Sequence, residues 1–161
     1  TYRERWTSTL KGLIISELEA MLKVSGLQGT IEATDKVKHL EYIILSLGTE
    51  ESGIAEVIND KLHKPLIKTN GSLVYQQLYN GKVQVMIVYP FIEGFGEPRP
   101  PKVISIYRPE EIKTPFFFFF MEEFIKEITQ WEDFDDDDQA AAKIGFNVQS
   151  LAAAKPPVTE G

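Results

Sequence analysis

The sequence predicts an α+β fold: three N-terminal helices, a three-stranded antiparallel meander, and a C-terminal helix packed on the sheet. Three observations support this class. Apolar residues recur at helical spacing up to residue 62, they alternate from residue 73 onward, and helical spacing returns after residue 114. The chain has 161 residues, enough for one core. We expect a globular domain at 1–131, an acidic hinge at 132–138 and an extended tail at 139–161.

The first predicted helix covers residues 7–24. Its apolar positions share one face, with Glu17, Glu19 and Lys23 outside it. Gly26 and Gly29 follow, and glycine commonly ends a helix. The apolar stripe consists of Leu10, Leu13, Ile14, Leu18, Met21 and Leu22.

Two further helices are predicted at 35–47 and 49–62. Thr34 or Asp35 would cap the first, and Pro65 would close the second. The run 42–45 is β-branched and aromatic enough to form a buried strand, so the sequence leaves 40–47 open between helix and strand. The apolar stripes are Val37, Leu40, Ile44 and Leu47 in the first, and Ile54, Val57, Ile58 and Leu62 in the second.

The alternating segments predict strands at 73–79, 82–91 and 102–107. Asn80-Gly81 between the first two is typical of a type I′ hairpin turn. On the second strand one face is fully apolar, whereas the other carries Gln84, Met86 and Val88. Residues 92–101 contain five Gly and Pro residues and are predicted to be an irregular loop.

The last predicted helix covers residues 114–131. Thr114 can cap it and Pro115 fits its first turn. Five consecutive phenylalanines, 116–120, exceed what one helix face can bury, and the sequence leaves open whether they lie inside the domain or in an interface. The predicted buried stripe is Phe117, Met121, Phe124, Ile125 and Ile128.

The formal net charge of −7 is concentrated in one short segment. Residues 132–138 contain six acidic residues and no basic one, whereas residues 1–131 contain 15 basic and 17 acidic residues. Carboxylates at a helix C-terminus oppose the helix dipole, so we expect this run to end the helix. A nearly neutral body argues against a protein that coats nucleic acid.

The sequence offers little chemistry, so we expect no enzyme, no cofactor, no metal site and no small-molecule substrate. There is no cysteine, and His39 and His63 are the only histidines. Three helices followed by a β-hairpin is the element order of a winged helix, which binds nucleic acid. However, Glu50 and Glu51 lie at the start of the helix predicted at 49–62 and would repel phosphate. Nucleic-acid binding is therefore a minor alternative.

No signal peptide and no run of about 20 apolar residues is apparent, so we expect no membrane insertion. The expected location is the cytoplasm or an assembled particle.

Aromatic residues exceed what a small core needs, and aromatic residues anchor protein interfaces. The sequence therefore predicts a structural or adaptor subunit of a larger assembly, such as a virion tail or a secretion-type particle. Its partners would be other protein subunits, including copies of itself. The main alternative is a small acidic chaperone that holds an apolar client segment. The predicted partner-binding residues are Phe91, Phe95, Pro98, Pro100, Phe134, Ile144, Phe146, Val148 and Leu151.

Overall fold

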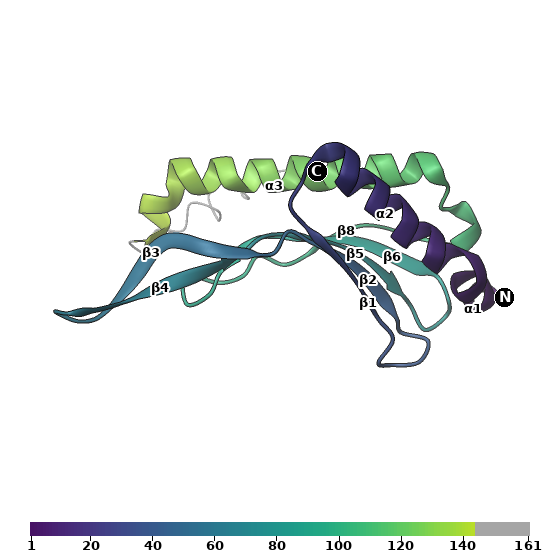
Figure 1. The fold of residues 1–161 in the computed structure, drawn as a ribbon, viewed down its shortest axis with the longest axis horizontal. Coiled ribbons are helices and arrows are strands. Elements are labelled where there is room, and N and C mark those ends of the chain that lie inside the picture. Colours follow the sequence, from purple (N-terminus) through teal and green to yellow (C-terminus); the bar gives the residue numbers. More distant parts are fainter. Residues whose placement is uncertain (144–161) are drawn as a thin grey trace. The chain divides into compact units, whose positions relative to one another are not determined.

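The structure is a computed structural model, which describes the backbone of residues 1–143 and the side chains of residues 1–133. It has a helical N-terminal segment, two antiparallel sheets and a long C-terminal helix (Figure 1). The α+β class is confirmed, but the three N-terminal helices and the three-stranded sheet are not. Residues 1–128 form one compact unit and residues 129–161 a second. The packing described below lies within the first unit.

The N-terminal segment is helical from Tyr2 to Ser25. It consists of α1 (Tyr2–Arg5), a π-helical turn (Trp6–Leu10) and α2 (Lys11–Ser25). The Thr1 hydroxyl accepts a hydrogen bond from the backbone N–H of Glu4 at 3.2 Å, which caps the first turn. Gly26 has a φ of 75°, a left-handed conformation that closes the helix. The helix predicted at 7–24 is therefore confirmed, although it begins earlier.

The larger sheet has five antiparallel strands in the order β1-β2-β5-β6-β8. The predicted strands at 73–79, 82–91 and 102–107 correspond to three neighbours in this sheet. The other two strands extend it beyond the predicted meander. The five strands are β1 (Thr30–Thr34), β2 (Tyr42–Ser46), β5 (Ser72–Gln77), β6 (Val83–Val88) and β8 (Lys102–Tyr107).

The helices predicted at 35–47 and 49–62 were wrong. Residues 42–46 form β2, the alternative that the sequence left open, and most of 49–62 forms β3 (Thr49–Asn59). In β2 the residues of both faces are apolar, which removes the alternation that identifies a strand. In β3 the register shifts between Glu51 and Ala55 and again between Val57 and Asn59, so its apolar residues fall at helix-like spacing.

Strands β3 and β4 (Leu62–Thr69) form a long ribbon, which we call the arm. The arm continues the β2–β5 pair, because Leu47 N–H donates to the carbonyl of Gly71 at 3.1 Å and Asn70 N–H to that of Gly48 at 2.9 Å. A two-residue strand, β7 (Phe91–Ile92), pairs with the base of β4. Together β3, β4 and β7 form the second sheet.

The turn between β5 and β6 contains three residues rather than the predicted two. Gly81 N–H donates to the carbonyl of Leu78, and Leu78 N–H donates to that of Lys82, both at 2.8 Å. Gly81 has a φ of 89°, whereas Asn80 does not have the positive φ that a type I′ turn requires. The hairpin is confirmed, but its turn type was wrong.

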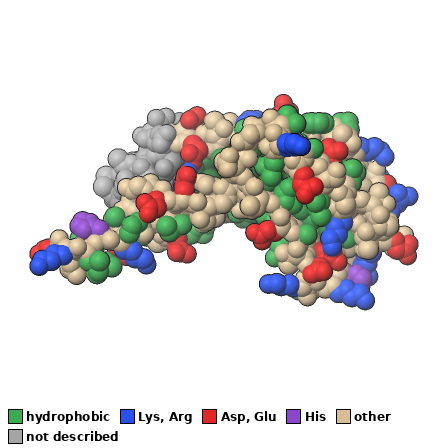
Figure 2. All heavy atoms as spheres, in the orientation of Figure 1, with side chains coloured by type: hydrophobic (Ala, Val, Ile, Leu, Met, Phe, Trp, Pro, Cys, Tyr) green, Lys and Arg blue, Asp and Glu red, His purple; other side chains and the backbone are tan. Residues whose placement is uncertain are grey.

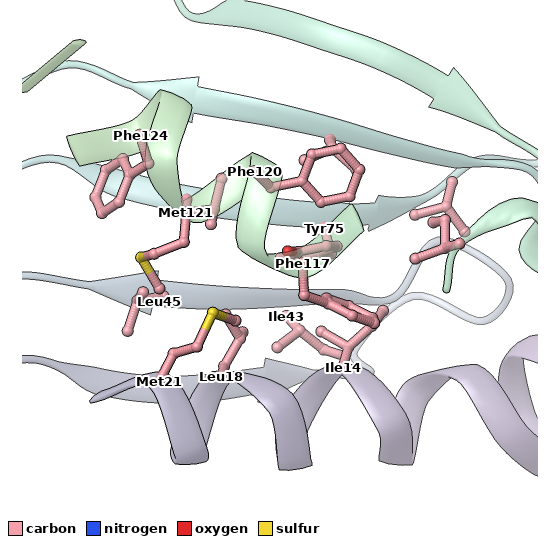
Figure 3. Close-up of a cluster of buried hydrophobic side chains, with 14 of the residues drawn as sticks. Ile14, Leu18, Met21, Ile43, Leu45, Tyr75, Phe117, Phe120, Met121 and Phe124 are labelled. Carbon is pink, nitrogen blue, oxygen red and sulfur yellow. The ribbon is translucent and has the colours of Figure 1, made fainter. Parts of the chain in front are cut away.

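The core lies between one face of the five-stranded sheet and the helices. Figure 1 shows α2 and the first part of α3 (Thr114–Lys143) on the same side of this sheet. Figure 3 shows side chains of both helices meeting those of the strands around Tyr75. The fully buried members include Ile14 and Leu18 of α2, Ile43 and Leu45 of β2, Tyr75 of β5, and Phe117, Phe120 and Phe124 of α3.

Helix α3 begins at Thr114 as predicted but continues to Lys143, so it does not end at the acidic run. The expectation that carboxylates would stop it near Trp131 was wrong, because opposing the dipole costs only a few tenths of a kcal/mol to about 1 kcal/mol at an exposed site. The tail assigned to 139–161 lies mostly outside the described residues, and the division into hinge and tail stays a prediction.

Candidate protein-binding face

The five-stranded sheet has a second face, which points away from the helices. We call it the outer face. Side chains alternate across a strand, and the inward residues of β2, β5 and β6 are almost fully buried. The residues between them therefore point outward. The apolar members of the outer face are Tyr42, Ile44, Val74, Met86, Val88, Val103 and Ile106.

Strand register places four of these residues in one row. Ile44 lies opposite Val74, Val74 lies opposite Met86, and Met86 lies opposite Val103. Side chains opposite each other on antiparallel strands are in contact range, so the row is a continuous apolar stripe across four strands. Val74, on the middle strand, is buried.

An irregularity in β8 adds to this face. The β6–β8 register shifts between Val85 and Met86, so Val103 and Ile106 both lie opposite outward-facing residues although they are an odd number of positions apart. Both remain open, with exposed fractions of 48% and 49%. The bulge therefore turns two large aliphatic side chains to the same open surface.

The outer face carries almost no charge. Its polar members are mainly neutral, with Gln76 and Gln84 opposite each other on β5 and β6. Glu32, on the edge strand β1, is the only charged residue that alternation places on this face. An antiparallel sheet face in water normally alternates with polar residues, so an apolar and uncharged outer face has the composition of a covered surface.

The arm is the second exposed feature of the first unit. All residues from 55 to 65 are exposed. Val57 and Ile67 lie on one side of the ribbon, and the other side carries a 3.5 Å ion pair between Glu50 and Lys68. Figure 2 shows hydrophobic side chains along the arm between acidic and basic ones. Charged residues and Pro65 protect its strand edges, so contacts of the arm would involve its faces.

Four of the predicted partner-binding residues lie in and after β7. Phe91 and Phe95 are half-buried, whereas Pro98 and Pro100 are exposed. Arg99, between the two prolines, places its guanidinium 4.1 Å from the centre of the Tyr89 ring. The structure thus brings these prolines to the surface on an anchored segment. Phe134, Ile144, Phe146, Val148 and Leu151 lie outside the described side chains.

The phenylalanine run divides between core and surface. Phe117 and Phe120 are fully buried, whereas Phe116, Phe118 and Phe119 are exposed. The predicted stripe missed Phe120 and wrongly included Ile125, which is exposed. Helical geometry explains the split, because only positions three and four apart share the sheet-facing side.

A polar cluster joins α3 to the edge of the sheet. One carboxylate oxygen of buried Glu127 accepts a hydrogen bond from the Tyr89 hydroxyl at 2.8 Å, and the other accepts one from Lys102 Nζ at 2.7 Å. Burial raises the pKa of Glu127, but the bonds from Lys102 and Tyr89 outweigh it and hold the pKa below its ordinary value. Burial and the bond to Glu127 raise the pKa of Tyr89 to about 12. Both oxygens of Glu127 are engaged, so the cluster fixes the helix.

The two histidines lie far from this cluster in sequence, and His39 is partly buried whereas His63 is exposed. His39 is in the loop before β2 with a φ of 69°, and His63 is in the arm. Within the described part of the chain, no three His, Asp or Glu side chains form a group suited to a metal ion. Among the helices that the structure describes, none has the length and apolar content needed to span a bilayer.

Sequence reasoning found only part of the candidate site. It identified the mixed face of β6 with Met86 and Val88, but not the residues that β2, β5 and β8 add to it. A usable signal was present in the consecutive apolar residues of 42–45, 73–75 and 103–104, which indicate strands that are apolar on both sides. The winged-helix alternative needed helices at 35–47 and 49–62, and these segments contain strands instead.

The chain matches no protein-family model, no curated protein and no solved structure. The functional argument therefore depends on its own surfaces.

Proposed function

We propose that this chain is a non-enzymatic structural or adaptor subunit of a larger protein assembly, and that the outer face is its main contact. The observation that carries the proposal is the apolar row from Ile44 to Val103 on a sheet face with one charged residue. Fully burying an exposed aliphatic side chain is worth about 1.5–3 kcal/mol, so Val103 and Ile106, which are about half exposed, would each contribute part of that. A partner that covers several of these residues would gain enough to offset the entropy lost on association.

Two further surfaces support a role with several contacts. The arm is a two-stranded ribbon, which is marginally stable in water unless something packs on it. The segment around Pro98 and Pro100 is held by Arg99 on Tyr89 and by Lys102 on Glu127. An anchored segment loses less entropy when it docks. In this proposal the arm, the loop 91–101 and the residues from Phe134 onward reach neighbouring subunits.

A chaperone that holds an apolar client segment is the second candidate. Gln76 and Gln84 favour it, because they lie opposite each other beside the apolar row and offer side-chain amides to a client backbone. A transient client and a permanent neighbour would use the same face. They differ in whether one partner or many occupy it.

The test is site-specific photo-crosslinking in cells that produce the protein. A crosslinking amino acid replaces Met86 on the outer face or, as the control, Val24, which is 88% exposed on α2. A structural subunit would crosslink through position 86 to one partner in a fixed ratio, and Val103→Glu would abolish that product. Many unrelated clients would favour the chaperone. No product above the Val24 control would overturn both.

A further inference from the structure

We propose that the partner on the outer face is a second copy of this chain, packed face to face across a two-fold axis. The inference rests on the proposed function and names the neighbour of one surface. Two apolar sheet faces pack well in proteins, about 10 Å apart, with their side chains interdigitated. Here each copy would provide the layer that the other lacks.

The size of the face suits a weak but specific pair. Strands lie about 4.8 Å apart and residues about 3.4 Å apart along each, so five strands of about six residues cover roughly 24 by 20 Å. Each copy would therefore contribute about 500 Å², and the pair about 1,000 Å², which is near the lower limit for a specific interface. We expect a dimer that forms and dissociates with concentration.

The charge distribution permits self-association. With the axis along β5, the middle strand, β1 of one copy lies over β8 of the other. The two copies of Glu32 are then at opposite ends of the interface and do not repel each other. Residues 1–131 carry a formal charge of only −2, so the bodies repel weakly.

The same lack of charge favours a second copy over an unrelated partner. Interfaces between different proteins commonly gain specificity from complementary charges and from charges that exclude wrong partners. The outer face has no such pattern. A two-fold interface needs only a patch that is complementary to itself, and a neutral apolar row satisfies this requirement.

The first experiment uses the purified full-length chain, which contains no cysteine. Met86→Cys and Val24→Cys variants are treated with a short bis-maleimide over a series of protein concentrations. We expect dimers to accumulate at least tenfold more in Met86→Cys than in Val24→Cys. Light scattering of the unmodified chain should move from the 18.3 kDa monomer toward twice that mass as the concentration rises.

The second experiment breaks the contact. In this arrangement Val103 lies over Glu32 of the other copy, because the strand register places both residues in one row. Val103→Glu therefore sets two like charges against each other at each end of the interface and should weaken dimerisation at least tenfold, whereas Val24→Glu should leave it unchanged. Val103 is half exposed, so the variant should fold, and circular dichroism checks this. Val103→Thr provides a milder variant that should weaken the dimer less.

Three results would overturn the inference: a monomer at every concentration, a dimer that Met86→Cys does not crosslink, or a dimer that Val103→Glu leaves intact. Photo-crosslinking through position 86 in cells separates this failure from failure of the proposed function. If the purified chain is a monomer and position 86 captures one other protein in a fixed ratio, the second copy is wrong and the assembly role stands. If position 86 captures nothing, the assembly role fails as well.

Discussion

The two faces of the five-stranded sheet have similar chemistry but different surroundings. The inner face is covered by α2 and α3, and residues such as Ile43, Leu45 and Val85 are fully buried there. The outer face carries Ile44, Val74, Met86 and Val103 in one row with neither helix over them. The inner face therefore forms the core of the monomer, whereas the outer face leaves Val103 and Ile106 about half exposed and is the surface that we propose binds a partner.

The largest expected effect comes from shortening one side chain that packs on the inner face of the sheet. Phe120 is fully buried, with its ring centre 5.8 Å from that of Tyr75 and 5.5 Å from that of Tyr107. Phe120→Ala should lower the free energy of unfolding by about 3–5 kcal/mol, because it leaves a cavity among aromatic rings. Phe118→Ala, two positions away and 56% exposed, is the matched control and should cost far less. Urea denaturation measures both, and equal losses would place Phe118 in a packed environment as well.

The next effect tests how α3 is held on the inner side. Glu127→Gln removes the charge that accepts hydrogen bonds from Tyr89 and Lys102, and should cost about 1–3 kcal/mol at pH 7. The folded-state pKa of Glu127 lies below its ordinary value of 4.5, so its contribution is present above that value and is lost as the pH falls below it.

The free energies of unfolding of Glu127→Gln and the native chain should therefore converge in acid. Glu122→Gln, on an exposed position of the same helix, is the control and should change little at either pH. Urea midpoints between pH 3 and pH 7 measure the difference. A gap between Glu127→Gln and the native chain that stays constant across this range would contradict the ion-pair assignment.

The comparison also explains which elements the sequence could predict. Strand β6 was found because its inner face is apolar and its outer face is broken by Gln84. Strand β2 was ambiguous because Tyr42 and Ile44 make its outer face as apolar as its inner one. Strand β3 of the arm was mistaken for a helix because two register shifts disrupt its alternation and no buried face constrains it.

The candidate site was harder to predict than the fold. The apolar row needs the register of four strands, and one of these, β2, could not be assigned from its own residues. The odd spacing of Val103 and Ile106 conceals that they share a face, because the bulge in β8 lies between the two residues. The apolar pattern within each β-strand therefore identified Met86 and Val88, but it could not predict which residues of the other strands lie beside them.

A smaller effect concerns a polar group within the covered side. The hydroxyl of Tyr75 is buried without a hydrogen-bond partner among the described residues, and burial raises its pKa strongly. Tyr75→Phe removes this unsatisfied group and keeps the ring contacts with Phe117 and Phe120. We expect the free energy of unfolding to rise by about 1 kcal/mol, since an unsatisfied buried polar group costs about 1–3 kcal/mol. A loss of stability in thermal denaturation would show that the hydroxyl has a partner, such as a buried water.

The smallest expected effect is the most direct test of the two faces, because the same substitution is made on each. Val103→Thr on the outer face should change the free energy of unfolding by less than about 0.5 kcal/mol, as at other open positions. Val85→Thr on the inner face should cost about 1–3 kcal/mol, because it buries a hydroxyl among apolar side chains. Urea denaturation at low protein concentration keeps the measurement on the monomer. If Val103→Thr costs as much as Val85→Thr under these conditions, the outer face is already covered within the single chain and is not free for a partner.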